Sequence, residues 1–363
     1  MMGITARRLR AQRLTGKPLA SPVDVVRWLG AVQSQDYAGA KWALARRSRA
    51  TTDAALDRLF DDGAILRTHV MRPTWHFVVP EDIRWLLDLT ASRVRAGLAS
   101  RYRELEIDDR VAARAAAAFA TALAGGRYLT RPELGQALRA AGISPEGQRL
   151  PHLLLRAELD QVIVSGPRHG KQFTYARFEE RVPKSPALER SEALGELTLR
   201  YFRSHGPAQV SDFTWWSGLT AAEARRGIDM AGGDLECVTF DGNDYWCEAT
   251  ANKPSSAGVV AHLLPNFDEY TVGYRDRSAL IPTGGPFDPS LYSFGSILSN
   301  ILTIDGIVRG AWRRIPAREA LHVEVRLSEI LNARDAALAQ DAVGRLSRFL
   351  GRPVQLASNR GGG

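Results

Sequence analysis

The sequence predicts an α+β fold in which tandem winged helix-turn-helix domains, three in number, precede a β-rich, barrel-like C-terminal domain. The first observation is an order that recurs three times: short helical segments and then two strand-like runs joined by a turn. The second is a strand-rich pattern that follows Pro254. The third is length, since 363 residues are too many for one ordinary globular domain.

The first repeat begins at Ser21, whose hydroxyl can cap a helix with Asp24 three residues later, as in a capping box. We expect this helix to continue to about Gln33. The other elements predicted for this repeat are helices over residues 38–47 and 53–60 and two strands within residues 65–79.

The second repeat carries a helix-start signal at Thr130, Pro132 and Glu133, which supply a cap, a first-turn proline and an acid. The other elements predicted for it are helices over 111–123 and 148–160 and a hairpin within 162–176. The elements predicted for the third repeat are helices near 189–203, 210–217 and 221–230 and a hairpin over 236–248.

The C-terminal part is expected to be mostly strands with one amphipathic helix. Its predicted elements are strands over 262–265, 301–312 with a turn at Asp305-Gly306, 323–327 and 354–357, a helix over 334–350 and a disordered tail over 359–363. The predicted domains are therefore residues 1–108, 109–183, 184–253 and 254–363.

The two cysteines both lie in the third hairpin. With a turn over residues 241–244, Cys237 would face Glu248 and Cys247 would face Val238, so the thiols point to opposite faces and a disulfide is not expected. These thiols and seven scattered histidines show no metal-ligand spacing, so we expect no metal and no cofactor. The sequence contains neither a signal-peptide core nor a run of about 20 apolar residues, so we expect a cytoplasmic, nucleoid-associated monomer without a membrane partner.

The net charge of +8 is concentrated at one end of the chain. Residues 1–50 contain ten cations and two acids, so their balance of +8 equals that of the whole protein. Heavy use of arginine can reflect a GC-rich genome, but that would not collect the excess in one segment. The distribution predicts a polyanionic partner at the N-terminal domain.

The most unusual short segment is Gln33-Ser34-Gln35-Asp36, at the junction of the first two predicted helices. No glycine-rich phosphate loop, HExxH, nucleophile elbow or CxxC motif occurs in the chain. On spacing alone, Gln33 could end one helix, Asp36 could cap the next, and both glutamines could be solvated.

Four segments occur in an order that is typical of one family. They are residues 30–36 followed by Lys41-Trp42-Ala43, residues 66–82, residues 263–277 (LLPNFDEYTVGYRDR) and residues 304–312 (IDGIVRGAW). These segments resemble motifs of the AlkZ/YcaQ-like winged-helix DNA glycosylases over nearly the whole chain. The polar Ser34 stands where the characterised glycosylases of the Gln-x-Gln type carry a hydrophobic residue.

The resemblance implies a monofunctional DNA glycosylase that hydrolyses the N-glycosidic bond of purines alkylated at N7 or N3, including bulky adducts or interstrand crosslinks. The catalytic residues that it implies are Gln33 and Gln35, whose amide oxygens would orient the attacking water. Asp36 would be either a general base or a helix cap. The alternative function is a winged-helix DNA-binding protein or regulator without catalysis.

The expected partner is double-stranded DNA carrying damaged purines. The residues expected to contact it are Lys41, Arg46, Arg47, Arg67, Arg72, His76, Arg275 and Arg277. The cations within 67–76 could instead be ordinary surface charges, and those within 275–277 could form an internal salt-bridged turn. We expect Trp215 and Trp216 in the core of the third repeat, and a structural role for His69.

Overall fold

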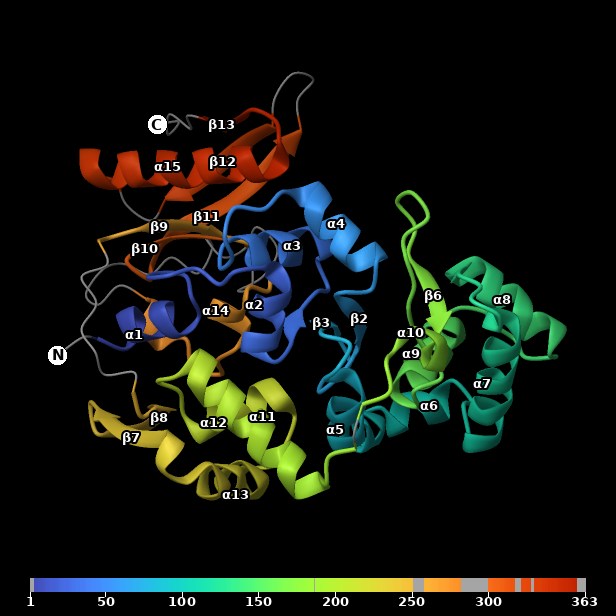
Figure 1. The fold of residues 1–363 in the computed structure, drawn as a ribbon. Coiled ribbons are helices and arrows are strands. Elements are labelled where there is room, and N and C mark those ends of the chain that lie inside the picture. The colour runs from blue at the N-terminus through green and yellow to red at the C-terminus, as the bar shows by residue number, and fades with distance from the viewer. Residues whose placement is uncertain are drawn as a thin grey trace.

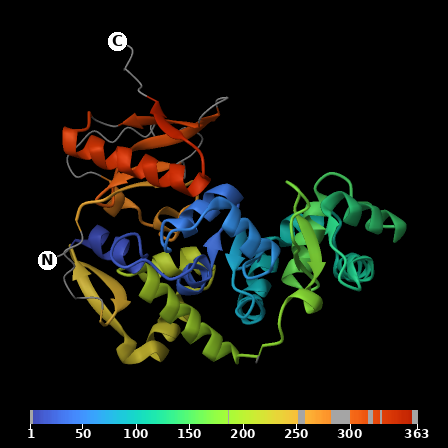
Figure 2. The ribbon, with the colours of Figure 1, turned by 45° about the horizontal axis from the view of Figure 1, so that its top comes forward.

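The computed structural model describes residues 3–185, 187–250, 258–281, 300–316, 321–327 and 330–357. The fold is mixed α+β, and the chain forms an arc (Figure 1). The C-terminal sheet lies at one end, the first repeat at the centre and the second repeat at the other end. A second view shows the same separation (Figure 2).

The first repeat is built around a short three-stranded sheet. Its elements are α1 (Ile4–Ala11), α2 (Pro22–Leu29), β1 (Val32–Gln33), α3 (Tyr37–Ala45), α4 (Asp53–Asp61), β2 (Leu66–His69) and β3 (Trp75–Val78). The capping box of Ser21 and Asp24 is confirmed. The prediction that this helix reaches Gln33 is wrong, because Gly30 with φ +81° ends it and β1 then pairs with β3.

The second repeat follows two helices that the sequence reading missed, α5 (Ile83–Gly97) and α6 (Ala99–Glu104). Its elements are α7 (Asp109–Leu123), β4 (Leu129–Thr130), α8 (Arg131–Ala140), α9 (Arg149–Leu159), β5 (Ile163–Ser165), β6 (Thr174–Arg177) and α10 (Phe178–Arg181). The predicted helix start at Thr130 is confirmed, and the Thr130 N–H donates to Glu133. The sheet order β4-β6-β5 matches the order β1-β3-β2 of the first repeat.

The third repeat has the same helix–hairpin order. Its elements are α11 (Arg190–His205), α12 (Val210–Ser217), α13 (Ala221–Ala231), a 3₁₀ turn (Gly232–Asp234), β7 (Leu235–Phe240) and β8 (Asn243–Glu248). Ala208, just before α12, bridges Trp246 on β8, in the place that β1 and β4 take in the other repeats.

The register predicted for this hairpin is wrong by two residues. Cys237 faces Trp246 and Cys247 faces Glu236, because the turn is the two-residue Asp241-Gly242 with both φ values positive. The thiols still lie on opposite faces, Cys237 exposed and Cys247 buried, and both are free.

The C-terminal part forms a five-stranded sheet of order β13-β12-β11-β10-β9. Its elements are β9 (Ala261–Leu264), α14 (Glu269–Val272), a 3₁₀ turn (Ser278–Leu280), β10 (Ile301–Ile304), β11 (Ile307–Pro316), β12 (Leu321–Leu327), α15 (Ala333–Leu350) and β13 (Val354–Ala357). The predicted turn at Asp305-Gly306 is confirmed. The predicted disordered tail over 359–363 lies outside the described residues. In the described ranges, no helix is both long and apolar enough to cross a membrane.

Three large hydrophobic clusters hold these parts together. One lies mostly in the second repeat, with residues such as Phe119 and Leu138, and also includes Tyr102 of α6. Another joins the helices of the first repeat to the C-terminal sheet through residues such as Trp42 and Phe349. The third joins the first hairpin and α5 to the third repeat and to residues of the second, such as Leu159 and Phe178. The segment from Gln33 to Asp36 therefore lies where three parts of the chain meet.

Candidate active site

Gln33 sits at the end of β1 and is 7% exposed. Its backbone N–H donates to Glu269 Oε1 at 2.9 Å, and its side-chain Oε1 accepts from Arg72 Nη2 at 3.4 Å. The backbone of Gln33 is thus held by Glu269 of the C-terminal part, and its side-chain amide by Arg72 of the turn between β2 and β3. An amide oxygen has two lone pairs, so one acceptor position remains for another donor.

Ser34 is fully buried and continues the extended backbone. Its N–H donates to the Trp75 carbonyl at 2.7 Å, and its own carbonyl accepts from Arg67 Nη2 at 3.0 Å and from Arg67 Nε at 3.2 Å. Gln35 follows as an exposed residue at the rim of a cavity. The turn from strand to helix therefore separates a buried glutamine from an exposed one.

Asp36 caps α3, as one of its two predicted roles requires. Its Oδ1 accepts from the Gly39 N–H at 3.0 Å. A Cβ at position 39 would lie 2.5 Å from Asp36 Oδ2, so the glycine leaves room for this close contact.

Glu269 is a site residue that the sequence reading did not single out, although it lies within the segment 263–277. It is fully buried, and its Oε2 accepts from Trp216 Nε1 at 2.9 Å and lies 3.4 Å from His205 Nε2. Burial alone would raise the pKa of Glu269, but His205, the Gln33 N–H and Arg72 outweigh it and hold the pKa below its ordinary value. Glu269 is therefore a buried anion that is hydrogen-bonded to the backbone of Gln33.

Two of the cations predicted to bind DNA are inside the protein, which corrects that prediction. Arg47 is 1% exposed and is held by both carboxylate oxygens of Asp268, at 2.6 and 2.9 Å. Lys41 is 4% exposed and lies 2.6 Å from Asp57 and 2.8 Å from Asp53. Their charges are neutralised by neighbouring acids and are not presented to phosphate.

Arg67 and His76 are also buried, so their predicted phosphate contacts need the same correction. Arg67 packs over the rings of Trp75 and Phe173, and burial lowers its pKa to about 10. His76 is fully buried, and burial lowers its pKa well below the ordinary value, which keeps the ring neutral. Arg46 is half-buried beside His262, and burial with neighbouring arginines lowers its pKa to about 9.

One of the remaining predicted cations, Arg277, lies near an unexpected exposed aromatic residue. Trp216 is buried as predicted, but Trp215 is 46% exposed, with Arg277 lying 5.7 Å from its ring centroid. Burial lowers the pKa of Arg72, and the nearby Arg277 lowers it further. Arg275 is exposed. We call Arg72, Trp215, Arg275 and Arg277 the arginine–tryptophan patch.

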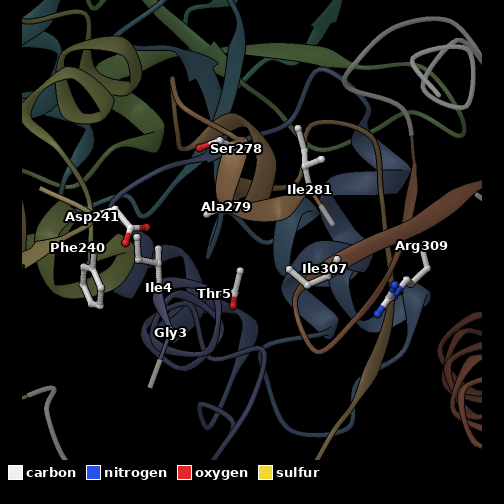
Figure 3. Close-up of a pocket in the computed structure, with 10 residues that line it drawn as sticks. All are labelled: Gly3, Ile4, Thr5, Phe240, Asp241, Ser278, Ala279, Ile281, Ile307 and Arg309. Carbon is white, nitrogen blue, oxygen red and sulfur yellow. The ribbon is translucent and has the colours of Figure 1, made fainter. Parts of the chain in front are cut away.

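A separate cavity of about 420 Å³ lies between α1, the β7–β8 hairpin and the 3₁₀ turn at Ser278–Leu280 (Figure 3). Its charged lining residues, Asp241 and Arg309, lie on opposite sides of it. None of the segment from Gln33 to Asp36 lines it. Among the described residues, no group of three or more His, Cys, Asp or Glu side chains could hold a metal ion.

Comparison with known proteins identifies the class. Residues 26–349 match the family model described as "DNA glycosylase AlkZ-like". The "Interstrand DNA cross-link repair glycosylase" of Streptomyces sahachiroi is 26% identical over 340 residues, which cover 85% of this chain and 86% of that protein. The solved structure of "Streptomyces sahachiroi DNA glycosylase AlkZ" shares the fold, with a TM-score of 0.77 and 22% identity over 97% of this chain and 98% of that one.

The protein is therefore a DNA repair glycosylase, a hydrolase that acts on N-glycosyl bonds. Within that class, the chain belongs to the AlkZ-like DNA glycosylase family.

Proposed function

We propose that this glycosylase removes purines alkylated at N7 or N3 from duplex DNA, including bulky adducts and interstrand crosslinks. The relative from Streptomyces sahachiroi is named for repair of interstrand cross-links, which supports the substrate class. The observation that carries the proposal is the extended backbone at Gln33, which Glu269 anchors. On a helix, residues i and i+2 would diverge by about 200°. The strand at Gln33 and the turn that follows it keep the segment out of a helix, which removes that constraint.

The proposed chemistry needs no strong acid. Alkylation at N7 makes the base cationic, so the C1′–N9 bond breaks with its electron pair going to the base. The sugar develops oxocarbenium character, and a water attacks C1′ and loses a proton to solvent. The amide oxygens of Gln33 and Gln35 accept hydrogen bonds from that water and hold it near C1′. The anion of Glu269 beneath Gln33 favours the cationic sugar.

The three helix–hairpin repeats are proposed as winged helices that follow the duplex as a monomer. Their shared strand order supports this, as does the matching bridge at Ala208. The proposed domains are those predicted from sequence, residues 1–108, 109–183, 184–253 and 254–363. The arginine–tryptophan patch replaces the N-terminal cations as the proposed DNA contact next to Gln33.

The test is release of free base from a duplex that carries one N7-methylguanine. Gln35→Ala and Gln33→Ala should each lower the single-turnover rate by about 10²–10³, because each removes a preorganised polar group. The double variant should lose far less than the product, because both side chains hold one water. Gln136→Ala, an exposed glutamine on α8, is the matched control and should keep the wild-type rate.

A duplex-binding assay separates the enzyme from the alternative binder. The two glutamine variants should bind undamaged duplex as tightly as wild type. A wild-type protein that binds duplex but releases no base from any of several N7 and N3 adducts would show that this chain is a DNA-binding protein without catalysis.

A further inference from the structure

The last residue of α11, His205, is a buried titratable group that the proposed chemistry does not use. Its side chain is fully buried, and its ring stacks on that of Tyr201 with a centroid distance of 4.6 Å and an interplanar angle of 11°. Its Nδ1 lies 2.8 Å from Ser204 Oγ. A Cβ at position 273 would lie 2.7 Å from His205 Cδ2, so Gly273 leaves the room that the ring occupies. These contacts hold the imidazole in one orientation.

This orientation places the other ring nitrogen, Nε2, against the carboxylate of Glu269. The distance from Nε2 to Glu269 Oε2 is 3.4 Å, and an ionised carboxylate can only accept hydrogen bonds, so we place the proton on Nε2. With that proton, the ring donates to Glu269 in its neutral and in its charged form. The same Oε2 accepts from Trp216 Nε1, and Oε1 accepts from the Gln33 N–H, both at 2.9 Å. Glu269 therefore joins the third repeat to the segment from Gln33 to Asp36.

The charge of Glu269 depends on its neighbours, because burial by itself raises the pKa and favours the protonated acid. The titratable groups around the carboxylate are His205 of α11, Arg72 of the first hairpin and Tyr201 of α11. Burial raises the pKa of Tyr201 well above its ordinary value, so that hydroxyl stays neutral. After burial, the hydrogen bond from His205 is the largest influence on the pKa of Glu269, and it lowers that pKa. Loss of Nε2 should therefore raise the pKa of Glu269.

The ionised form of Glu269 supports Gln33 in two ways. As an anion, it is a stronger acceptor for the Gln33 N–H than a protonated acid would be. Its charge also opposes the effect of burial on Arg72, whose Nη2 donates to the side-chain oxygen of Gln33 at 3.4 Å. Within the described ranges, Arg72 makes no ion pair of its own, so protonation of Glu269 would leave a buried guanidinium without compensation.

We propose that His205 is a positioning residue for base excision, which keeps Glu269 ionised and thereby holds both the backbone and the side chain of Gln33 in place. The inference rests on the proposed glycosylase function and adds to it a residue of the third repeat. His205 and Glu269 are both fully buried, so they act on the reaction from inside the protein and do not contact DNA.

The pH dependence of excision tests this proposal. In the wild type, Glu269 stays ionised, so the single-turnover rate on a duplex with N7-methylguanine should be flat between about pH 5 and 8, after correction for base loss without enzyme. His205→Phe keeps the aromatic stack but removes Nε2, so Glu269 should lose its charge as the pH falls through its raised pKa. The His205→Phe rate should approach the wild-type rate at the alkaline end and fall about 10- to 100-fold toward the acid end.

Three further variants separate charge from structure. His205→Gln supplies an amide N–H near the position of Nε2 and should restore a flat profile. Glu269→Gln cannot ionise, so its rate should be about 10- to 100-fold low at every pH. Tyr201→Phe removes a buried hydroxyl that donates to the Gly273 carbonyl at 2.7 Å, beside the same ring, but leaves the donors to Glu269 in place, so its profile should stay flat.

Undamaged duplex should bind all these variants as tightly as wild type over the same pH range. His205→Met replaces the Phe variant if urea denaturation shows that the latter does not fold, because an unbranched side chain adapts to irregular space. A rate for the apolar variant that equals that of wild type throughout, or that is reduced by one factor at every pH, would overturn the proposal. A histidine that only fills space would give that result.

The backbone N–H signal of Gln33 gives a readout that does not need catalysis. In NMR spectra of His205→Phe, this signal should shift as Glu269 titrates, whereas in the wild type and in His205→Gln it should stay in place. If the wild type releases no base, the glycosylase proposal fails, and this titration alone decides whether His205 controls the charge beside Gln33. A signal that does not move in His205→Phe overturns the inference, with or without base release by the wild type.

Discussion

The first and second repeats share a strand order but differ in what they bury. The second repeat packs around its own cluster, which draws on residues between 102 and 175. The helices of the first repeat instead share a cluster with distant residues such as Leu263, Trp312 and Phe349. Equal local topology therefore does not imply equal independence. The first repeat depends on the C-terminal part, whereas the second has a cluster of its own and also contributes residues such as Leu159 and Phe178 to the cluster of the third repeat.

The same difference applies to charge. Of the ten cations in residues 1–50, Arg7, Arg8, Lys41 and Arg47 are buried, and the three arginines pair with acids beyond residue 200. Much of the N-terminal excess is thus internal and is balanced by the rest of the chain. A local surplus of charge in a sequence is evidence of a polyanion site only if the side chains reach the surface.

The largest expected effect comes from breaking this internal pairing. Arg47→Ala leaves Asp268 buried without its partner, so it should lower the free energy of unfolding by about 3–5 kcal/mol. Arg49→Ala, which removes an exposed cation two residues away, should change it by less than about 0.5 kcal/mol. Urea denaturation measures both. Equal, small effects would mean that the first repeat does not depend on the C-terminal part through this pair.

A smaller effect compares one helix cap in each repeat. Asp36 caps α3 in the first repeat and Asp108 caps α7 in the second, through contacts of 3.0 and 2.7 Å. Asp36→Ala and Asp108→Ala should each cost about 0.5–2 kcal/mol of unfolding free energy, and both should keep base excision. If Asp36→Ala alone abolished excision at unchanged duplex affinity, Asp36 would be the general base and the two caps would not be equivalent.

The comparison also explains which features the sequence could predict. Signals that act over a few residues were confirmed, including the capping box at Ser21, the helix start at Thr130 and the turn at Asp305-Gly306. Predictions failed where the deciding partner lies far along the chain. Arg47 meets an acid 221 residues away, and the N–H of Gln33 meets Glu269 across 236 residues. No local pattern encodes such a pair.

In the candidate site, too, predictions failed where a distant part of the chain decides the local structure. The sequence indicated Gln33 and Gln35, but the predicted helix through Gln33 was wrong because β1 pairs with β3 more than 40 residues later. The cations were predicted from type and position, without knowledge of burial. Trp215 and Trp216 are neighbours in sequence and were expected to share one environment, yet only Trp216 is buried.

The smallest expected effect concerns the surface that remains for DNA. If the arginine–tryptophan patch contacts phosphate, Arg275→Ala should flatten the slope of log affinity against log salt by roughly one unit, because one fewer counterion is released. Arg334→Ala, an exposed cation at the start of α15, is the matched control and should leave the slope unchanged. Filter binding of undamaged duplex over a range of salt concentrations measures both. If the slope were unchanged for Arg275→Ala and flatter for Arg334→Ala, the DNA-binding surface would lie on the C-terminal part and not at the junction of the repeats. The buried cations of the first repeat should contribute nothing to this slope, because their counterions are acids of the protein itself and are not released when DNA binds.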